Sequence, residues 1–325
     1  MSLNIVRYQI EETVSWGVLT RDQITPLDIP CSTTGDLLAI GLDALQIAAA
    51  HATPSIPVSQ VTLLSPITAS AKVLCQGANY RQHIIDSGLD PDAQSFNMFF
   101  TKSSAAITDP QGAIIKPSHV KLLDYEIELT LVLDKKTTQA VQVTADNLHD
   151  YVAGICIGND VSARDVQIPQ MQFHKGKSYR TFCPLGPVLC LLSRDEMHYL
   201  NELNLTLSVN GEVRQSDSTA NLVFKPAETL TEFSQIANFE PGDVLMTGTP
   251  SGCALGLPPP VVVRLTGLLP EAKKWQLFKK SQQRRSQYLQ AGDRVELHIC
   301  SSDGYIDLGR QQHTIVASDV AGAQS

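Results

Sequence analysis

Alternating apolar and polar positions divide much of the chain into short strands. Residues 4–9, 14–19 and 127–133 alternate with a period of two, which is typical of strands with one buried face. Residues 152–159 form a continuous apolar run, which is typical of a strand buried on both faces. Residues 203–215 alternate on either side of an Asn-Gly dipeptide, a strong β-hairpin signal. The pattern therefore predicts a β-rich α+β fold.

The sequence predicts fewer helices than strands, and a proline-containing segment divides the chain into two domains. The apolar residues favour helices in three segments, 37–51, 228–237 and 271–289. The prolines within residues 53–58 favour extended backbone and indicate a linker. We therefore expect a small N-terminal domain over residues 1–70, which carries no cluster of titratable side chains, and a larger domain over residues 71–325.

Residues 254–290 differ in composition from their surroundings, and we interpret them as an insertion. A run of prolines is followed by the helical segment, which carries six basic residues, at positions 273, 274, 279, 280, 284 and 285. A basic helix can bind nucleic acid or lipid, but the whole chain has a net charge of −8. We expect a solvated helix or a subunit contact, and neither a nucleic-acid nor a membrane partner.

The composition is that of a globular protein in a reducing compartment. Hydrophobic residues make up 43% of the 325 residues and charged residues 18%, an ordinary balance for a chain with a sizeable core. The seven cysteines are odd in number and form no CxxC pair, so they indicate buried thiols and not a disulfide framework. The first nine residues lack a signal-peptide pattern, and no apolar run approaches about twenty residues. These features predict a cytoplasmic protein.

Two glutamates within the alternating strand are the first candidates for chemistry. Glu126 and Glu128 are two residues apart, so in a strand their carboxylates point to the same face, and Asp160 follows the buried run 152–159. Carboxylates this close repel one another, and a hard divalent cation such as Mg²⁺, Mn²⁺ or Ca²⁺ would relieve the repulsion. The alternative is an exposed strand face with two solvated glutamates.

A histidine near the start of the larger domain is a candidate base. We expect Asn79 to cap a short helix that starts near Tyr80, on which His83 and Asp86 are three residues apart and share a face. A neighbouring carboxylate orients an imidazole and favours its charged form, which suits a general base. A surface His–Asp pair without function is the alternative. Further on, Lys102 ends a short strand and faces either a site or solvent.

Several common catalytic motifs are absent from the sequence. Gly176-Lys177-Ser178 resembles the end of a phosphate-binding loop, but Met171 stands where that motif needs glycine. We find no GxSxG elbow, no HExxH and no GxGxxG after a strand. These absences argue against a serine hydrolase, a zinc peptidase or a dinucleotide-dependent enzyme.

Four longer motifs, in order, resemble those of the fumarylacetoacetate hydrolase superfamily: residues 124–129, 150–165, 175–187 and 241–250. The resemblance covers about residues 73–253 and resumes over 291–316. It implies a catalytic domain of mixed β-sheets rolled around a metal site, a smaller N-terminal domain before it, and a homodimer.

The resemblance also implies roles for individual residues. Glu126, Glu128 and Asp160 would bind Mg²⁺ or Mn²⁺. His83 with Asp86 would activate water, and Lys177 would neutralise charge that develops on the substrate. The substrate pocket would be lined by Tyr80, Lys102, Arg164, Gln167 and Thr249. Two positions depart from the family pattern: Asp86 stands where related acylpyruvate hydrolases have glutamate, and Gln76 stands where the eponymous hydrolase has a further aspartate ligand.

The implied reaction is a metal-dependent cleavage of a C–C bond through an enolate. The expected substrate is a β-diketo or 2-keto acid, acylpyruvate-like or fumarylpyruvate-like, and water activated by His83 would attack its second carbonyl. Without that attack the same enolate chemistry gives isomerisation or decarboxylation. The alternative is therefore an isomerase or decarboxylase of 2-hydroxy-dienoate or oxaloacetate-type substrates in aromatic catabolism. A further alternative is a non-catalytic metal-binding scaffold.

Overall fold

A large mixed sheet runs through the computed structural model, which describes residues 1–51, 55–88, 90–256 and 269–318. Within this part of the chain the sheet has the order β4-β3-β2-β1-β15-β12-β11-β18-β6-β7, and β5 pairs with β1. Its strands are β1 (Leu3–Ile10), β2 (Thr13–Thr20), β3 (Gln23–Leu27), β4 (Ile56–Pro57), β5 (Thr62–Leu64), β6 (Val73–Gly77), β7 (Met98–Lys102), β11 (Ile127–Leu133), β12 (Val152–Asn159), β15 (Leu189–Leu191) and β18 (Val244–Met246).

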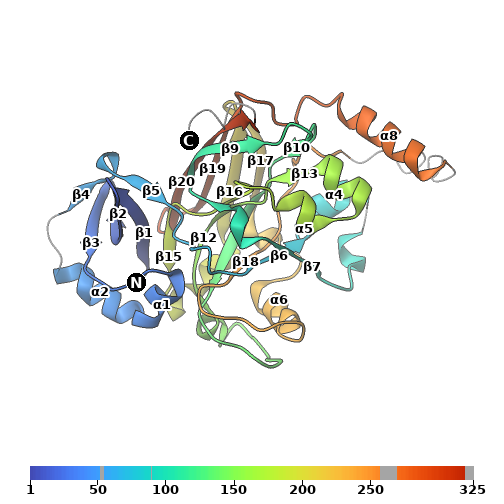
Figure 1. Cartoon of the computed structure of the whole chain (residues 1–325). Coiled ribbons are helices and arrows are strands. Elements are labelled where there is room, and N and C mark those ends of the chain that lie inside the picture. Colours follow the sequence, from blue (N-terminus) through green and yellow to red (C-terminus); the bar gives the residue numbers. More distant parts are fainter. Residues whose placement is uncertain (52–54, 89, 257–268, 319–325) are drawn as a thin grey trace.

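A second sheet of five strands, in the order β17-β16-β19-β20-β9, packs against the first (Figure 1). Its strands are β9 (Gln111–Lys116), β16 (Leu203–Val209), β17 (Glu212–Ser218), β19 (Arg294–Ser301) and β20 (Asp307–Ala317). Two short pairs complete the strands, β10 (Leu123–Asp124) with β13 (Ser162–Ala163) and β8 (Ile107–Thr108) with β14 (Cys183–Pro184). The predicted β-rich α+β fold with mixed sheets is confirmed.

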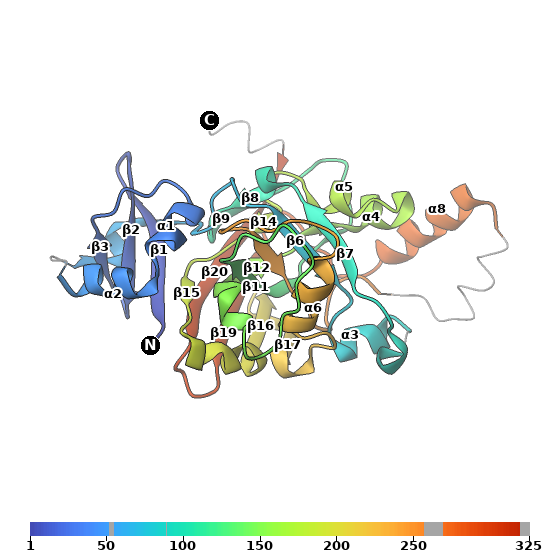
Figure 2. The same cartoon turned by 90° about the horizontal axis from the view of Figure 1, so that it is seen from below.

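The helices pack around these sheets, and the first two bury Leu37 and Leu45 against the N-terminal strands. They are α1 (Thr34–Ile40), α2 (Leu42–His51), α3 (Arg81–Asp86), α4 (Arg164–Gln170), α5 (Phe173–Lys177), α6 (Pro226–Phe233) and α8 (Glu271–Gln282). The helix predicted over residues 37–51 is two helices, because Gly41 has a φ of 83° and ends the first of them. Figure 2 shows α8 projecting from the body of the protein. Among the described residues, no helix combines the length and apolar character needed to cross a membrane.

The N-terminal strands, α1 and α2 form a lobe at one side of the molecule (Figure 1). Its sheet is continuous with the sheet of the larger lobe, because β1 pairs with β15 from Leu3 opposite Leu191 to Ile5 opposite Leu189. The division into domains near residue 70 stays a prediction, since strand pairing crosses it.

Strand β11 lies at the centre of the large sheet, and all seven of its residues are buried. Leu129 and Leu131 pack into the core shared with the second sheet, whereas Val132 packs into the core on the opposite face. The alternating pattern predicted one buried face, but Thr130 on the other face is also covered. Hydrophobic side chains pack against both faces of β11 and hold it rigidly. Residues at the start of this strand therefore have fixed positions.

The predicted hairpin is confirmed at the edge of the second sheet. Strands β16 and β17 pair from Val209 opposite Glu212 outwards. Asn210 and Gly211 between them have φ values of 53° and 83°. A two-residue turn with positive φ at both positions favours these two residue types.

Candidate active site

Three carboxylates converge where β11 begins and β12 ends. The two strands are antiparallel, with Ile127 opposite Asn159, so Glu126 and Asp160 are neighbours, and the backbone N–H of Asp160 donates to the Glu126 carbonyl at 2.9 Å. One carboxylate oxygen from each of Glu126, Glu128 and Asp160 lies within 4.8 Å of the others, and all three residues are buried. The exposed strand face considered as an alternative is thereby excluded.

A glycine turn after β18 holds Glu128. The backbone N–H of Gly248 donates to Glu128 Oε2 at 2.8 Å. Gly248 has a φ of 92°, and a Cβ there would lie 3.0 Å from the Cβ of Asn79, so a side chain would be strained at this position. On the next residue, the Thr249 hydroxyl donates to the Ile127 carbonyl at 2.8 Å and fixes the turn against β11.

Two buried lysines compensate the carboxylates. Lys177 at the end of α5 donates to Glu126 Oε2 at 2.7 Å, to Asp160 Oδ2 at 2.5 Å and to the Ser162 hydroxyl at 2.7 Å. Lys102 at the end of β7 forms an ion pair with the other oxygen of Asp160 and donates to the Phe182 carbonyl at 2.8 Å. Lys102 thus points inward to Asp160 and not to solvent, but it does not line the site cavity, so its predicted contact with substrate stays a prediction.

The surroundings of Glu126 and Glu128 shift the pKa values of the two carboxyl groups in opposite directions. Burial by itself raises the pKa of a carboxyl, but the guanidinium of Arg164 and the ammonium of Lys177 outweigh it and lower the pKa of Glu126 to about 2. For Glu128, burial together with the charges of Asp160 and Glu126 outweighs the charge of Lys177 and raises the pKa well above the usual range. Burial opposes the charge of Lys177, but Asp160 and Glu126 outweigh it and raise the pKa of that ammonium.

An arginine joins the site to the insertion. Arg164 donates from Nε to Asp124 Oδ2 at 2.8 Å and from a terminal nitrogen to Gln167 Oε1 at 2.8 Å, and it also forms an ion pair with Glu126. Asp124 in turn accepts the backbone N–H groups of residues 254 and 255 at 2.7 and 3.0 Å. Asp124 is the first residue of the motif that contains Glu126, but no local pattern indicates that it is the buried partner of an arginine.

The expected His83–Asp86 dyad is not formed by contacts among the described residues. The Asp86 carboxylate is exposed and accepts hydrogen bonds from Gln82 at 2.8 Å and from the Ser251 hydroxyl. The ring of His83 lines the site cavity, and burial lowers its pKa below the ordinary value. At neutral pH His83 is therefore an uncharged imidazole that faces the site.

The helix cap predicted near α3 is wrong. Asn79 does not cap the helix, because its side chain donates to the carbonyls of Phe224 at 3.1 Å and Thr247 at 3.0 Å and accepts from the Phe224 N–H. The helix starts after Tyr80 without a side-chain cap. Tyr80 itself is completely buried in the core and does not line the cavity, so a contact with substrate has no support.

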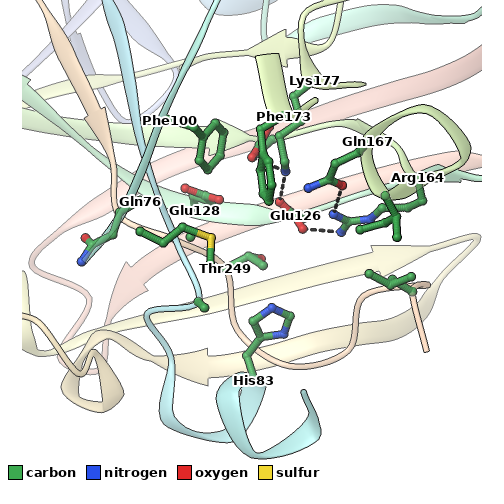
Figure 3. A pocket seen from close by; sticks show the side chains of 16 residues that line it. Gln76, His83, Phe100, Glu126, Glu128, Arg164, Gln167, Phe173, Lys177 and Thr249 are labelled. Atoms are coloured by element: carbon green, nitrogen blue, oxygen red, sulfur yellow. Dashed lines mark hydrogen bonds and ion pairs between the residues drawn. The ribbon is translucent and has the colours of Figure 1, made fainter. Parts of the chain in front are cut away.

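The cavity is small and bounded by charged and aromatic side chains (Figure 3). Its volume is about 130 Å³, well below the range of roughly 300–1,000 Å³ for sites that take drug-sized ligands. The labelled residues of Figure 3 that line it are Gln76, His83, Phe100, Glu126, Glu128, Arg164, Gln167, Phe173, Lys177 and Thr249. A small polar molecule is the kind of ligand that such a cavity accommodates.

The donor set fits a hard divalent cation. Four buried carboxylates, from Asp124, Glu126, Glu128 and Asp160, face three buried cations, Lys102, Arg164 and Lys177. Among the described residues Glu128 has only the Gly248 N–H as a hydrogen-bond partner, so its carboxylate is the least compensated of the four. Oxygen-only ligation suits Mg²⁺, Mn²⁺ or Ca²⁺. Glu126, Glu128 and Asp160 are the residues that would hold the ion.

Mixed sheets around a carboxylate-lined pocket define the class of protein. The family model described as "Fumarylacetoacetate (FAA) hydrolase C-terminal" matches residues 72–316, and the chain belongs to this family. Its curated relatives include the rat protein "Oxaloacetate tautomerase Fahd2a, mitochondrial" (Rattus norvegicus), which is 36% identical over 259 residues that cover 78% of this chain and 80% of the relative. "Oxaloacetate tautomerase YisK" of Bacillus subtilis is 39% identical over 210 residues, 63% of this chain and 67% of the relative.

Solved structures agree with the fold over almost the whole chain. A fumarylacetoacetate hydrolase from Exiguobacterium antarcticum has a TM-score of 0.74 at 28% identity and covers 97% of this chain and 99% of that one. A probable 2-hydroxyhepta-2,4-diene-1,7-dioate isomerase from Mycobacterium abscessus has a TM-score of 0.73 at 28% identity, covering 98% and 99%. The resemblance that the sequence motifs indicated is confirmed.

Proposed function

We propose that this protein is a divalent-metal-dependent keto–enol tautomerase of a small 2-oxo dicarboxylic acid of the oxaloacetate type. The observation that carries the proposal is the environment of His83, a neutral imidazole that faces a small carboxylate-lined cavity and is not paired with Asp86. A hydrolase needs a base oriented to activate water, whereas a tautomerase needs only a base that reaches the substrate carbon. The curated relatives named as oxaloacetate tautomerases support the same choice.

The reaction moves one proton. The imidazole of His83 takes the proton from the carbon beside the 2-oxo group, and the electron pair of that C–H bond forms the carbon–carbon double bond. The former carbonyl oxygen then receives a proton from the imidazolium or from water, so atoms and charge balance. Lys177 carries a fixed positive charge at the edge of the cavity and stabilises the negative oxygen.

The metal and the remaining side chains of the cavity would bind the substrate and stabilise the charge on its oxygens. Mg²⁺ or Mn²⁺ held by Glu126, Glu128 and Asp160 would supply Lewis acidity for the paired oxygens of a 2-oxo acid. Gln167 is fixed by Arg164 and turns its amide toward the cavity, and Thr249 closes the cavity next to β11. The sequence favoured C–C bond hydrolysis, with isomerisation as the alternative. The proposed reaction is the isomerisation.

A kinetic assay with product analysis tests the proposal. The purified protein with Mg²⁺ or Mn²⁺ is mixed with oxaloacetate, and the ultraviolet absorbance of the enol is followed while NMR identifies the products. We expect faster interconversion of enol and ketone than in buffer, without formation of pyruvate. Pyruvate and carbon dioxide would identify a decarboxylase instead. Cleavage of acylpyruvates with no effect on oxaloacetate would restore the hydrolase.

A further inference from the structure

A second, larger cavity adjoins the site. Its volume is about 380 Å³, and it shares His83, Glu126, Arg164 and Leu255 with the inner cavity. The inner cavity has space for the 2-oxo acid end of a substrate, so the outer cavity lies where the rest of that substrate extends. The far wall of this outer cavity includes Arg285, from the end of the insertion.

Arg285 is a cation without a carboxylate partner among the described residues. Its Nε donates to the Ala254 carbonyl at 2.8 Å, which leaves the two terminal nitrogens for other acceptors. The other charged groups of this wall are engaged elsewhere: Arg164 with Asp124 and Glu126, and Asp86 with Ser251. A free guanidinium with two parallel donors matches the geometry of a carboxylate.

Glycine at position 256 allows the guanidinium to lie close to the backbone. A Cβ on Gly256 would lie 2.3 Å from a terminal nitrogen of Arg285 and 2.5 Å from its central carbon. Any side chain at position 256 therefore moves the guanidinium. This contact holds the arginine over the outer cavity.

The backbone that positions Arg285 is itself held on two sides. The buried side chain of Gln282 donates to the Gly256 carbonyl at 2.6 Å and accepts the Gly256 N–H at 3.2 Å, and the Tyr288 hydroxyl donates to the same amide at 2.8 Å. Residues 254 and 255 are bound to Asp124, as described above. The segment thus has a fixed position relative to the three metal-binding carboxylates, which a recognition site requires.

We propose that the outer cavity binds the distal carboxylate of a 2-oxo dicarboxylic acid and that Arg285 is the residue that selects for it. The inference rests on the proposed function, because it assumes that the 2-oxo acid end occupies the inner cavity. It assigns to the insertion a role in substrate selection and makes Arg285 a specificity-determining residue.

Calorimetric binding of two ligands of equal length tests the inference. In the presence of Mg²⁺, 2-oxoglutarate carries a distal carboxylate where 2-oxopentanoate has a methyl group. We expect the protein to prefer 2-oxoglutarate, and Arg285→Ala to weaken binding of 2-oxoglutarate by about ten- to a hundredfold, as for a hydrogen-bonded ion pair, while 2-oxopentanoate is unaffected. Arg284→Ala is the matched control, since Arg284 is exposed and does not line the cavity, and it should change neither affinity.

Two further variants test whether the position of the Arg285 guanidinium matters in addition to its positive charge. Gly256→Ala keeps the arginine but displaces its guanidinium, and it should reduce the preference for 2-oxoglutarate. Arg285→Lys keeps a point charge and should retain part of the preference. Equal weakening of both ligands by Arg285→Ala, or no weakening of either, overturns the inference.

The outcome is distinguishable from that of the proposed function. If the protein fails to accelerate oxaloacetate tautomerisation but shows the Arg285-dependent preference, the reaction is wrong and the recognition site stands. If tautomerisation is observed and Arg285→Ala leaves the KM for oxaloacetate and the binding preference unchanged, the reaction stands and the recognition site is wrong.

Discussion

The guanidinium of Arg164 and the carboxylate of Asp124 form a buried ion pair in which Nε lies 2.8 Å from Oδ2. Asp124 also accepts two backbone N–H groups from the start of the insertion, and Arg164 also pairs with Glu126. A single pair of side chains therefore joins the cluster of buried carboxylates, α4 and the insertion. This arrangement explains why an insertion remote in sequence can border the site.

Asp124→Asn should destabilise the protein substantially. The amide keeps one acceptor but leaves Arg164 with less negative charge in a buried place, and breaking one partner of a buried ion pair costs about 3–5 kcal/mol. We expect the free energy of unfolding, measured with urea, to fall by about 3 kcal/mol. The control is Glu240→Gln, which removes the exposed pair with Lys136 at 3.0 Å and should cost less than about 1 kcal/mol. A change as small as the control's would show that the pair does not hold the insertion.

The sequence anticipated the carboxylate cluster because its signal is local. The spacing of Glu126 and Glu128 places them on one face of a strand, and the apolar run before Asp160 delivers that residue to the same edge. Their convergence depends on an antiparallel pairing of neighbouring strands, which is a common arrangement. The hairpin at Asn210-Gly211 was predictable for the same reason, since two adjacent residues determine it.

Residues whose roles depend on distant partners were not predictable. Asn79 caps no helix because its side chain donates hydrogen bonds to the carbonyls of Phe224 and Thr247. These residues lie 145 and 168 positions away in the sequence. Arg285 appeared as one of six basic residues of a helical segment, and nothing local separates it from Arg284. Both side chains are exposed, and only the fold brings Arg285, and not Arg284, to the wall of the outer cavity. Part of the insertion, residues 257–268, lies outside the described residues.

Glu128→Gln should abolish tight divalent binding without destabilising the metal-free protein. Glutamine removes one of three anionic ligands but also removes the charge that Glu126 and Asp160 repel, and it can still accept the Gly248 N–H. Titration calorimetry with Mn²⁺ should show affinity reduced by at least about a hundredfold, a larger loss than the 10–100-fold typical of indirect partners. Unfolding in the presence of a chelator should occur at an unchanged or higher temperature. The exposed Glu212→Gln should leave metal binding unchanged, and retained Mn²⁺ affinity in Glu128→Gln would exclude Glu128 as a ligand.

His313, which lies well away from the site, should make the free energy of unfolding depend on pH. Its ring is buried, and burial, only partly opposed by a hydrogen bond with the Gly112 backbone, lowers its pKa from 6.5 to about 4. The unfolded chain therefore binds a proton near pH 6.5, whereas the folded protein binds it only near pH 4, so stability is lost as the pH falls between these values. The shift corresponds to about 3 kcal/mol.

His313→Leu tests this origin of the acid sensitivity. Leucine fills a similar volume and cannot be protonated, so the variant should lose about 3 kcal/mol less than the wild type between pH 6.5 and 4. Urea unfolding at a series of pH values measures the difference. The exposed His51→Asn is the control and should preserve the slope of the wild type. An unchanged slope in His313→Leu would assign the acid sensitivity to other groups.

His83→Ala and Asp86→Asn should differ strongly in their effects on catalysis. If His83 acts alone as the base, His83→Ala lowers kcat for oxaloacetate tautomerisation by about 10²–10⁴-fold, the usual contribution of a positioned base. Asp86→Asn should change kcat by less than about threefold, because its carboxylate binds Gln82 and Ser251 and not the imidazole.

The pH profile gives a second readout of the same assignment. A base must be unprotonated, and burial lowers the pKa of His83, so kcat/KM should stay constant down to below pH 6.5 and then fall as the pH drops through the lowered pKa. This acidic limb should vanish in His83→Ala and persist in Asp86→Asn. Equal losses in the two variants would mean that the side chains act as a dyad when substrate is bound. In that case a water-activating hydrolase would again be the better explanation of the site.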